Sequence, residues 1–177
     1  MTDTTLDAKN LVIRGVQIMA AGAIADFEAI VHPEAFNRES VDEPPACRGR
    51  GPAALYATAL WLRASYDELH WEIHDVAVDG DLAVAHATMS GRQTGTFVVY
   101  DADGAPKQAF PATGKRFATT QTHWFRIADG LLIEHWANRD DLGTATQLGW
   151  APPTPAYLFK MGRATRQARR AARRETP

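Results

Sequence analysis

The sequence predicts an α+β fold in which a curved antiparallel sheet packs on helices from the N-terminal part of the chain. Apolar residues recur at near-helical spacing over residues 6–20, 23–31 and 53–65. From Leu69 onward, apolar and polar residues alternate with a period of two, which is typical of half-buried strands. An Asp-Gly pair at 129–130 lies between two β-branched and aromatic runs and is a strong hairpin signal. Such a sheet can close like a cone over its helices and leave a central pocket.

The predicted helices have recognisable ends. Gly22 separates the first two helices, and His32-Pro33 ends the second because a residue before proline disfavours the helical conformation. Residues 41–51 are expected to form a loop, and Pro52 occupies the first position of the third helix.

The strands follow the helices. Two strands are expected over residues 69–78 and 82–94, joined by a turn at 79–81. Residues 101–114 contain several glycines and prolines, which indicates two short arms or a flexible loop. The longest hairpin is expected over residues 117–142.

The long hairpin carries most of the side chains that could perform chemistry. With a two-residue turn at 129–130, residues whose numbers sum to 259 are expected to face each other. One face is then expected to hold Thr119, Gln121, His123, Phe125, Glu134, Trp136, Asn138 and Asp140. The opposite face would carry His135 and Arg139. Aromatic side chains mixed with a histidine, amides and a carboxylate are typical of a ligand-lined cavity.

The length of the chain and the distribution of its charges indicate how its domains are organised. With 177 residues, the chain is expected to form one main domain over residues 1–149, followed by a Pro-rich linker and a basic tail over 150–177. Seven of the 19 basic residues lie from Lys160 onward, but only one of the 21 acidic residues does. We expect the tail to be a solvated helix lying on an acidic surface. Binding of nucleic acid or an anionic membrane is the alternative, and nucleic acid is not expected because aromatic residues are not interleaved with the charges.

Several function classes are not expected. No apolar run reaches the ~20 residues of a membrane helix, and no signal peptide is visible, so we expect a cytoplasmic protein with no membrane partner. The single cysteine, Cys47, provides neither a disulfide framework nor a metal cluster. His70 and His74 lie ~13 Å apart on a strand, too far to share one ion. We therefore expect no metal site.

Four stretches of the chain, in this order, resemble one known family. They are His32-Pro-Glu-Ala-Phe-Asn37, Tyr66-Asp67 through Trp71 to Gly80-Asp81, Gly91-Arg-Gln-Thr-Gly95 with Pro111-Ala-Thr-Gly114, and His123-Trp-Phe-Arg-Ile running to Glu134-His-Trp-Ala-Asn-Arg-Asp-Asp-Leu-Gly143 with Gln147-Leu-Gly149. Over about residues 8–149 the chain resembles the SnoaL-like polyketide cyclases, which belong to the NTF2-like superfamily of cone-shaped α+β folds.

The resemblance implies a cofactor-free enzyme, usually a homo-oligomer (a dimer or tetramer), that catalyses an intramolecular aldol closure of a polyketide ester. The substrate would be a small apolar carbonyl compound. The family's key aspartate falls on Asp140, and a pocket asparagine falls on Asn37. The chain departs from many relatives by carrying Arg38 and Arg92-Gln93 where those relatives carry a histidine, which leaves other substrates or reactions open.

The residues themselves fit aldol chemistry. One carboxylate, Asp140, could remove a proton next to a carbonyl and return it, if an apolar wall such as Trp136 raised its pKa. Neutral donors would steady the enolate oxygen. The candidate catalytic residues are Asp140 and His123, and the candidate substrate-binding residues are Asn37, Trp61, Gln93, Gln121, Trp136 and Asn138. The predicted register places His123 ~13 Å from Asp140, so no His-Asp dyad is expected.

Two alternatives stay open. The same scaffold could perform another acid/base reaction, such as hydration, dehydration, isomerisation or epoxide hydrolysis. It could also be a non-catalytic protein that binds a small molecule or assembles with a partner, because a fold does not fix a function.

Overall fold

The computed structural model of the protein describes residues 3–175. In chain order the elements are α1 (Asp3–Ala21), α2 (Ile24–Glu28), β1 (Val31–Asn37), η1 (Ser40–Asp42), η2 (Pro45–Arg48), α3 (Pro52–Ser65), β2 (Tyr66–Asp79), β3 (Leu82–Gln93), β4 (Phe97–Tyr100), β5 (Pro106–Phe110), β6 (Arg116–Ala128), β7 (Leu131–Arg139), α4 (Asp141–Leu148) and α5 (Pro155–Glu175).

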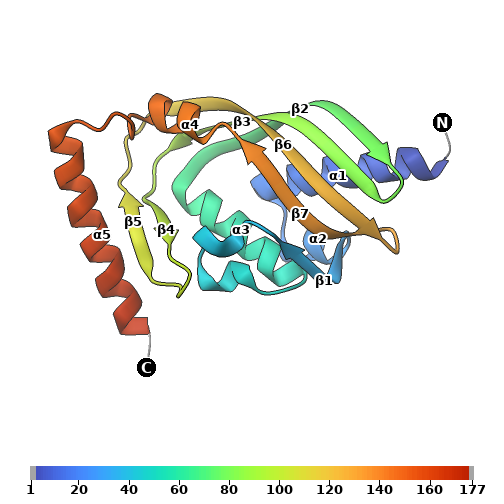
Figure 1. Ribbon diagram of the computed structural model, residues 1–177, viewed down its shortest axis with the longest axis horizontal. Helices are drawn as coiled ribbons and strands as arrows, with labels where there is room; N and C mark the ends of the chain where they lie inside the picture. The colour runs from blue at the N-terminus through green and yellow to red at the C-terminus, as the bar shows by residue number, and fades with distance from the viewer. Residues whose placement is uncertain (1–2, 176–177) are drawn as a thin grey trace.

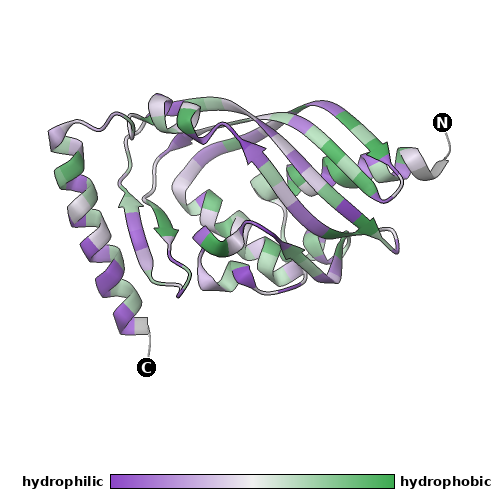
Figure 2. Cartoon of the chain, viewed as in Figure 1, coloured by the Kyte–Doolittle hydropathy of each residue, from purple (hydrophilic) through white to green (hydrophobic). Residues whose placement is uncertain are grey.

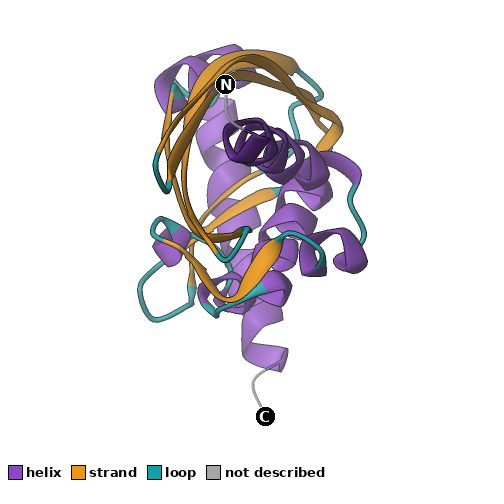
Figure 3. Cartoon of the chain, turned by 90° about the vertical axis from the view of Figure 1, so that its right-hand side faces the viewer, coloured by secondary structure: helices purple, strands orange, loops and turns teal. Residues whose placement is uncertain are grey.

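The predicted α+β class is confirmed. A five-stranded sheet in the order β1-β7-β6-β3-β2 curves over α1, α2 and α3 (Figures 1 and 3). The sheet is mixed and not purely antiparallel as expected, because the edge strand β1 runs parallel to β7. A parallel neighbour needs a long crossover connection, and the chain between β1 and β7 supplies it. The remaining neighbours in this sheet are antiparallel.

The core lies between the helices and the concave face of the sheet. Val12 and Val16 are four residues apart on α1 and point at the sheet, as the helical spacing predicts. Gly15 lies on the same side, where an added Cβ would come within 2.5 Å of Leu132 on β7. An added Cβ at this position would therefore require the Leu132 side chain to shift. Small residues also line β3, where Ala83, Ala85 and Ala87 are fully buried.

The helix boundaries differ from the prediction at one place. The second helix ends at Glu28, and the chain is already extended from Val31, so the His32-Pro33 pair lies inside β1. Proline is tolerated there because β1 is the edge strand of the sheet. The third helix starts at Pro52 as predicted.

The segment expected to form two short arms or a flexible loop contributes to a second, two-stranded sheet. β4 and β5 pair antiparallel and project from the main sheet toward α5 (Figure 1).

The C-terminal helix α5 packs on β5. Its Met161 is buried, and its Thr165 hydroxyl accepts a hydrogen bond from the Ala109 N–H (3.0 Å). Arg169 donates hydrogen bonds to the carbonyls of Pro106 and Lys107. Strongly hydrophilic residues recur along the rest of α5 (Figure 2).

The long hairpin has the predicted turn but not the predicted register. Asp129 and Gly130 both have positive φ angles (52° and 75°), as a two-residue hairpin turn requires. Ala128 pairs with Leu131, in agreement with the sum of 259. The register then shifts, because Arg126 pairs with Glu134 instead of residue 133.

The extra residue is Ile133, which forms a β-bulge in β7. Beyond it, paired residue numbers sum to 260: His123 pairs with Ala137 and Thr122 with Asn138. A one-residue slip moves every later side chain to the opposite face of the strand. The predicted distribution of β7 residues between the two faces is therefore wrong from Glu134 onward.

None of the helices within residues 3–175 combines the length and the apolar character that crossing a membrane would require.

Candidate active site

The concave face of β6 presents a mixture of polar and aromatic residues to the interior. Thr119, Gln121, His123 and Phe125 are all buried, while the residues between them are more exposed. This alternation is the period of two that the sequence predicts. Because of the bulge, His135 and Ala137 of β7 lie on the same side as these four residues.

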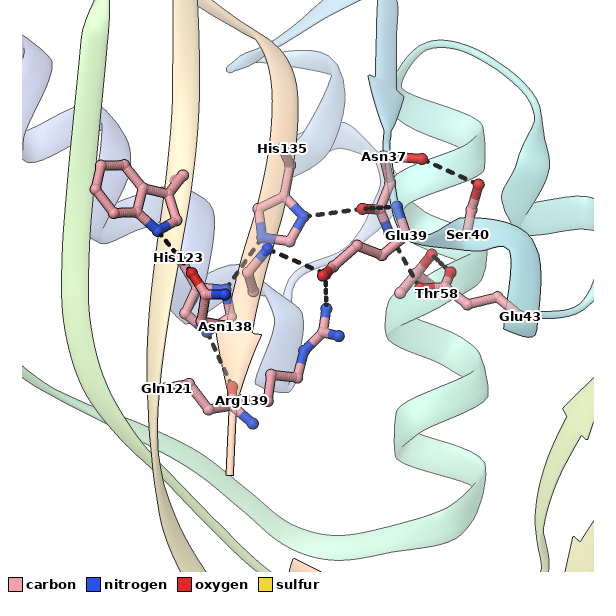
Figure 4. A network of polar contacts seen from close by, with 12 residues as sticks. Asn37, Glu39, Ser40, Glu43, Thr58, Gln121, His123, His135, Asn138 and Arg139 are labelled. Atoms are coloured by element: carbon pink, nitrogen blue, oxygen red, sulfur yellow. Dashed lines mark hydrogen bonds and ion pairs between the residues drawn. The ribbon is translucent and has the colours of Figure 1, made fainter. Parts of the chain in front are cut away.

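Four of the interior side chains form a hydrogen-bonded row (Figure 4). His123 Nε2 is 2.9 Å from Gln121 Oε1, and His123 Nδ1 is 3.1 Å from His135 Nε2. His135 Nδ1 is in turn 3.2 Å from Asn37 Oδ1, at the end of β1. The row thus crosses the inside of the sheet from β6 to β1.

The row continues into a buried carboxyl group. Asn37 Nδ2 donates to Glu43 Oε1 (3.0 Å), and the hydroxyl of Thr58 on α3 donates to Glu43 Oε2 (2.5 Å). Glu43 is 5% exposed, so its charged form has lost nearly all contact with water. Burial raises the pKa of Glu43, and the Thr58 hydrogen bond and the Arg139 charge oppose that rise.

The two histidines are neutral at neutral pH. Burial lowers the pKa of His123 to about 3, and the positive charge of Arg139 acts in the same direction. Burial also lowers the pKa of His135 well below its ordinary range, with smaller contributions from His123 and Arg139. A neutral imidazole has one N–H donor and one lone pair, so each ring can either take up or give a proton.

A carboxylate and a guanidinium flank the row where it approaches solvent. Glu39 Oε2 accepts hydrogen bonds from the Ala137 N–H (3.0 Å) and from Arg139 Nη2 (2.6 Å). The side chains of Glu39 and Arg139 are 32% and 30% exposed.

Asp140, the predicted acid/base residue, lies at the N-terminus of α4. Its Oδ1 accepts a hydrogen bond from the Gly143 N–H (2.7 Å), and the residue is exposed. This is the geometry of a helix N-cap. The structure thus gives Asp140 a capping role and places it outside the polar row.

Two predicted binding residues lie on the outer face of the sheet. Trp136 stacks on Trp124 with 6.1 Å between ring centroids, and the Arg38 guanidinium lies 4.0 Å from the Trp136 ring centroid. Asn138 is exposed and accepts a hydrogen bond from Trp124 Nε1 (3.2 Å). The predicted placement of Trp136 and Asn138 beside His123 is wrong, because the bulge at Ile133 turns them outward.

Two other predicted residues join the smaller sheet to the cone. Trp61 on α3 donates its indole N–H to the Val98 carbonyl (3.0 Å) and packs on Phe97 of β4. Gln93 is fully buried: its amide donates to the Phe110 carbonyl (3.0 Å), and its oxygen accepts from Trp150 Nε1 (3.1 Å). Neither side chain hydrogen-bonds to a member of the polar row.

The structure therefore brings together Asn37, Gln121 and His123 from the predicted set and adds His135, Glu39, Glu43 and Arg139. No signal in the sequence marks the bulge that turns His135 inward. Glu43 lies in a segment whose prolines and glycines predict a loop, and nothing in that pattern predicts a buried carboxyl group.

In the described part of the chain, no three His, Cys, Asp or Glu side chains are grouped so that they could hold a metal ion. Cys47 is buried, and burial raises the pKa of its thiol to about 12, so the nucleophilic thiolate is disfavoured. The chemistry that the row can support is proton transfer by neutral imidazoles whose ring nitrogens face the amide oxygens of Gln121 and Asn37.

A large surface hollow lies elsewhere. Its volume is about 810 Å³, and it is lined by α1, Ile30 and the tips of the β2–β3 and β6–β7 hairpins, with Leu11, Val78 and Ile127 among its apolar residues. None of the residues that line this hollow belongs to the polar row.

Comparison with known proteins shows to which family the chain is similar. The chain is 33% identical over 147 residues to the aklanonic acid methyl ester cyclase DnrD of Streptomyces peucetius, covering 82% of this chain and 93% of DnrD. It is 27% identical over 136 residues to the nogalonic acid methyl ester cyclase of Streptomyces nogalater, covering 76% and 91%.

Solved structures of similar proteins share the fold of this chain. TsrD from Streptomyces laurentii superposes with a TM-score of 0.65 at 28% identity, covering 84% of this chain and 98% of TsrD. A SnoaL-like protein from Jannaschia sp. CCS1 superposes with a TM-score of 0.67 at 21% identity, covering 86% and 98%, which supports the shared fold. The profile of the SnoaL-like polyketide cyclases matches residues 10–148. The chain belongs to the SnoaL-like polyketide cyclase family.

Proposed function

We propose that this protein is a cyclase that closes a ring in a small polyketide-like carbonyl substrate by acid/base catalysis. The observation that carries the proposal is the row of neutral imidazoles and amides inside the cone of a SnoaL-like fold. Family membership supports a cyclase, and the relatives named above act, by their names, on methyl esters of aklanonic and nogalonic acid. Esters of this type are therefore the first substrates to test.

The reaction we propose is an intramolecular aldol addition. A base takes a proton from the carbon between two carbonyl groups, and the enolate carbon forms a bond to a ketone carbon of the same molecule. The resulting alkoxide takes a proton back from the conjugate acid of that base. No atom is gained or lost overall, so the product is an isomer of the substrate.

The arrangement of the polar row indicates which groups could stabilise the enolate. An enolate next to the row would meet the imidazole rings and the guanidinium of Arg139, and the positive charge of the guanidinium favours a negative charge beside it. Asn37 and Gln121 would act by holding the two imidazoles in place, because their side-chain oxygens contact the ring nitrogens.

Two groups compete for the role of the base. Asp140 is the aspartate that the sequence resemblance indicates, and it stays a prediction. His123 and His135 form the alternative, and their support is their position inside the cone. The choice can be made with substitutions that separate the carboxylate of Asp140 from its capping role.

The test is turnover of aklanonic acid methyl ester and nogalonic acid methyl ester by the purified chain, followed by liquid chromatography and NMR of the product. We expect a product of unchanged mass with one new carbon–carbon bond. Unchanged substrate with both esters would contradict the proposed cyclase reaction on this substrate class.

Asp140→Asn removes the carboxylate but keeps a good N-cap, whereas Asp140→Ala removes both. If Asp140 is the base, both variants lose at least about 100-fold in kcat, the usual contribution of general base catalysis. If it is only a cap, Asp140→Asn keeps wild-type turnover, and Asp140→Ala loses about 1 kcal/mol of stability. Asp141→Asn, on the neighbouring exposed carboxylate, is the control for a change of charge.

The homo-oligomeric state and the cytoplasmic location expected from the sequence remain predictions, which light scattering and cell fractionation would test.

A further inference from the structure

The polar row has three contacts in series and too few protons to fill them. The contacts are Gln121 to His123 (2.9 Å), His123 to His135 (3.1 Å) and His135 to Asn37 (3.2 Å). Each contact needs one hydrogen between its two heavy atoms. Two neutral imidazoles bring one N–H each, so they supply two hydrogens for three contacts.

The ends of the row cannot supply the missing hydrogen. Gln121 Oε1 also accepts from Trp71 Nε1 (3.2 Å), so turning the amide would place two donors against each other. Asn37 Oδ1 also accepts from the Glu39 N–H (3.2 Å), while Asn37 Nδ2 donates to the Glu43 carboxyl group. Both amide orientations are therefore fixed by partners outside the row.

We propose that His123 and His135 together form a binding site for a single extra proton, with the two rings acting as one base. In the neutral pair, one contact always sets a lone pair against a lone pair. A third hydrogen turns all three contacts into hydrogen bonds and makes a shared imidazole–imidazolium pair. A fourth hydrogen would set two N–H groups against each other at the middle contact.

The surroundings decide when this proton is taken up. Arg139 on β7 is the cation near the pair, and it opposes uptake. Glu39 holds that guanidinium from the loop after β1. Glu43, which follows η1 and is bonded to Thr58 of α3, reaches the row through Asn37. On the remaining side lies the apolar ring of Phe125, whose centroid is 5.0 Å from the centroid of the His135 ring.

These surroundings keep the pair neutral until a negative charge forms beside it. An enolate generated next to the row would supply that charge at the moment its proton leaves carbon. The pair would then hold the proton and return it to the alkoxide. This role rests on the proposed cyclase function, whereas the proton site itself does not.

The test counts the protonated ring nitrogens of His123 and His135 by NMR of the full chain labelled with ¹⁵N-histidine. At pH 7 we expect two N–H and two unprotonated nitrogens across the two rings. On acidification we expect one joint transition to three N–H groups, with a scalar coupling across the contact from His123 Nδ1 to His135 Nε2. Two separate transitions, or a titration confined to one ring, would overturn the proposal.

Gln121→Glu keeps the shape of the acceptor and adds a negative charge next to His123. We expect it to raise the midpoint of the joint transition by at least one pH unit, which is a tenfold gain in proton affinity. Gln17→Glu, on the exposed face of α1, should leave the midpoint unchanged. A Gln121→Glu variant whose rings stay at two N–H groups between pH 8 and 4 would also overturn the proposal.

The two proposals can fail separately. A joint one-proton transition in a protein that turns over neither ester would contradict the proposed function only. Turnover by a protein whose histidines titrate independently would contradict the shared site only.

Discussion

His123 and His135 are held neutral inside the protein, and this makes its stability depend on pH. Burial sets the folded-state pKa of each ring below the value of about 6.5 expected in the unfolded chain. As the pH falls through 6.5, the unfolded chain binds protons that the folded chain does not. The free energy of unfolding therefore decreases over this window. Glu43 acts in the opposite sense, because its raised pKa lets the folded state bind a proton first.

We predict that the free energy of unfolding drops between pH 7 and pH 5, by up to about 2 kcal/mol for each histidine. Urea denaturation at the two pH values measures this change. The double variant His123→Gln/His135→Gln should lose less stability over the same interval. His74→Gln, at an exposed position, is the control. Equal losses in the wild type and the double variant would show that the pair does not cause the pH dependence.

The hairpin of β6 and β7 shows how one element sets the composition of the site. Its turn uses the Asp129-Gly130 pair, and its first residues follow the simple two-residue register. The bulge at Ile133 then adds one residue to β7. Because side chains alternate along a strand, this single residue puts His135 inside and Trp136 outside.

We predict that paired cysteines will report this register. Thr122→Cys with Asn138→Cys places two thiols directly opposite each other, within the Cα separation that a disulfide needs. Gln121→Cys with Asn138→Cys matches the register without a bulge, but in the structure these side chains lie on opposite faces. Mass spectrometry under non-reducing conditions should find the disulfide in the first variant only. A disulfide in the second variant alone would contradict the bulge.

At the scale of the whole molecule, a cone and a projecting arm are joined by a few buried contacts. The arm consists of β4, β5 and α5 (Figure 1). Gln93 and Trp150 connect it to the end of β3, and an aromatic stack of Trp150 with Phe97 and Phe110 lies beside them. The family profile ends at residue 148, so α5 lies outside the part of the chain that matches the family.

We predict that α5 stabilises the arm and not the cone. Removing the chain after Thr154 takes away the buried Met161 and the hydroxyl that accepts the Ala109 N–H. Hydrogen exchange followed by mass spectrometry should accelerate in β4 and β5 and stay unchanged in β6 and β7. Thr165→Val should accelerate exchange at Ala109, and Arg166→Ala, on the exposed side, should not. Equal acceleration in the large sheet would mean that α5 supports the whole fold.

The sequence by itself determined the local features. Helical spacing, Pro52 at a helix start and Asp129-Gly130 at a turn depend on neighbouring residues, so they could be predicted without the tertiary structure. The resemblance to the SnoaL-like family, which the family profile confirms, also rests on short quoted stretches. Of the site residues predicted from the sequence, Asn37, Gln121 and His123 lie together in the polar row of the structure.

The tertiary structure alone decided which side chains meet. The bulge at Ile133 adds one residue to β7, and no local preference in the sequence marks the place where a strand gains a residue. His135 therefore turned toward His123, and Trp136 and Asn138 turned outward. Glu43 joined the row through Asn37 and Thr58, which come from β1 and α3. Contacts between elements that are distant in the chain arise only when the sheet curves over the helices, so they could not be predicted from local patterns.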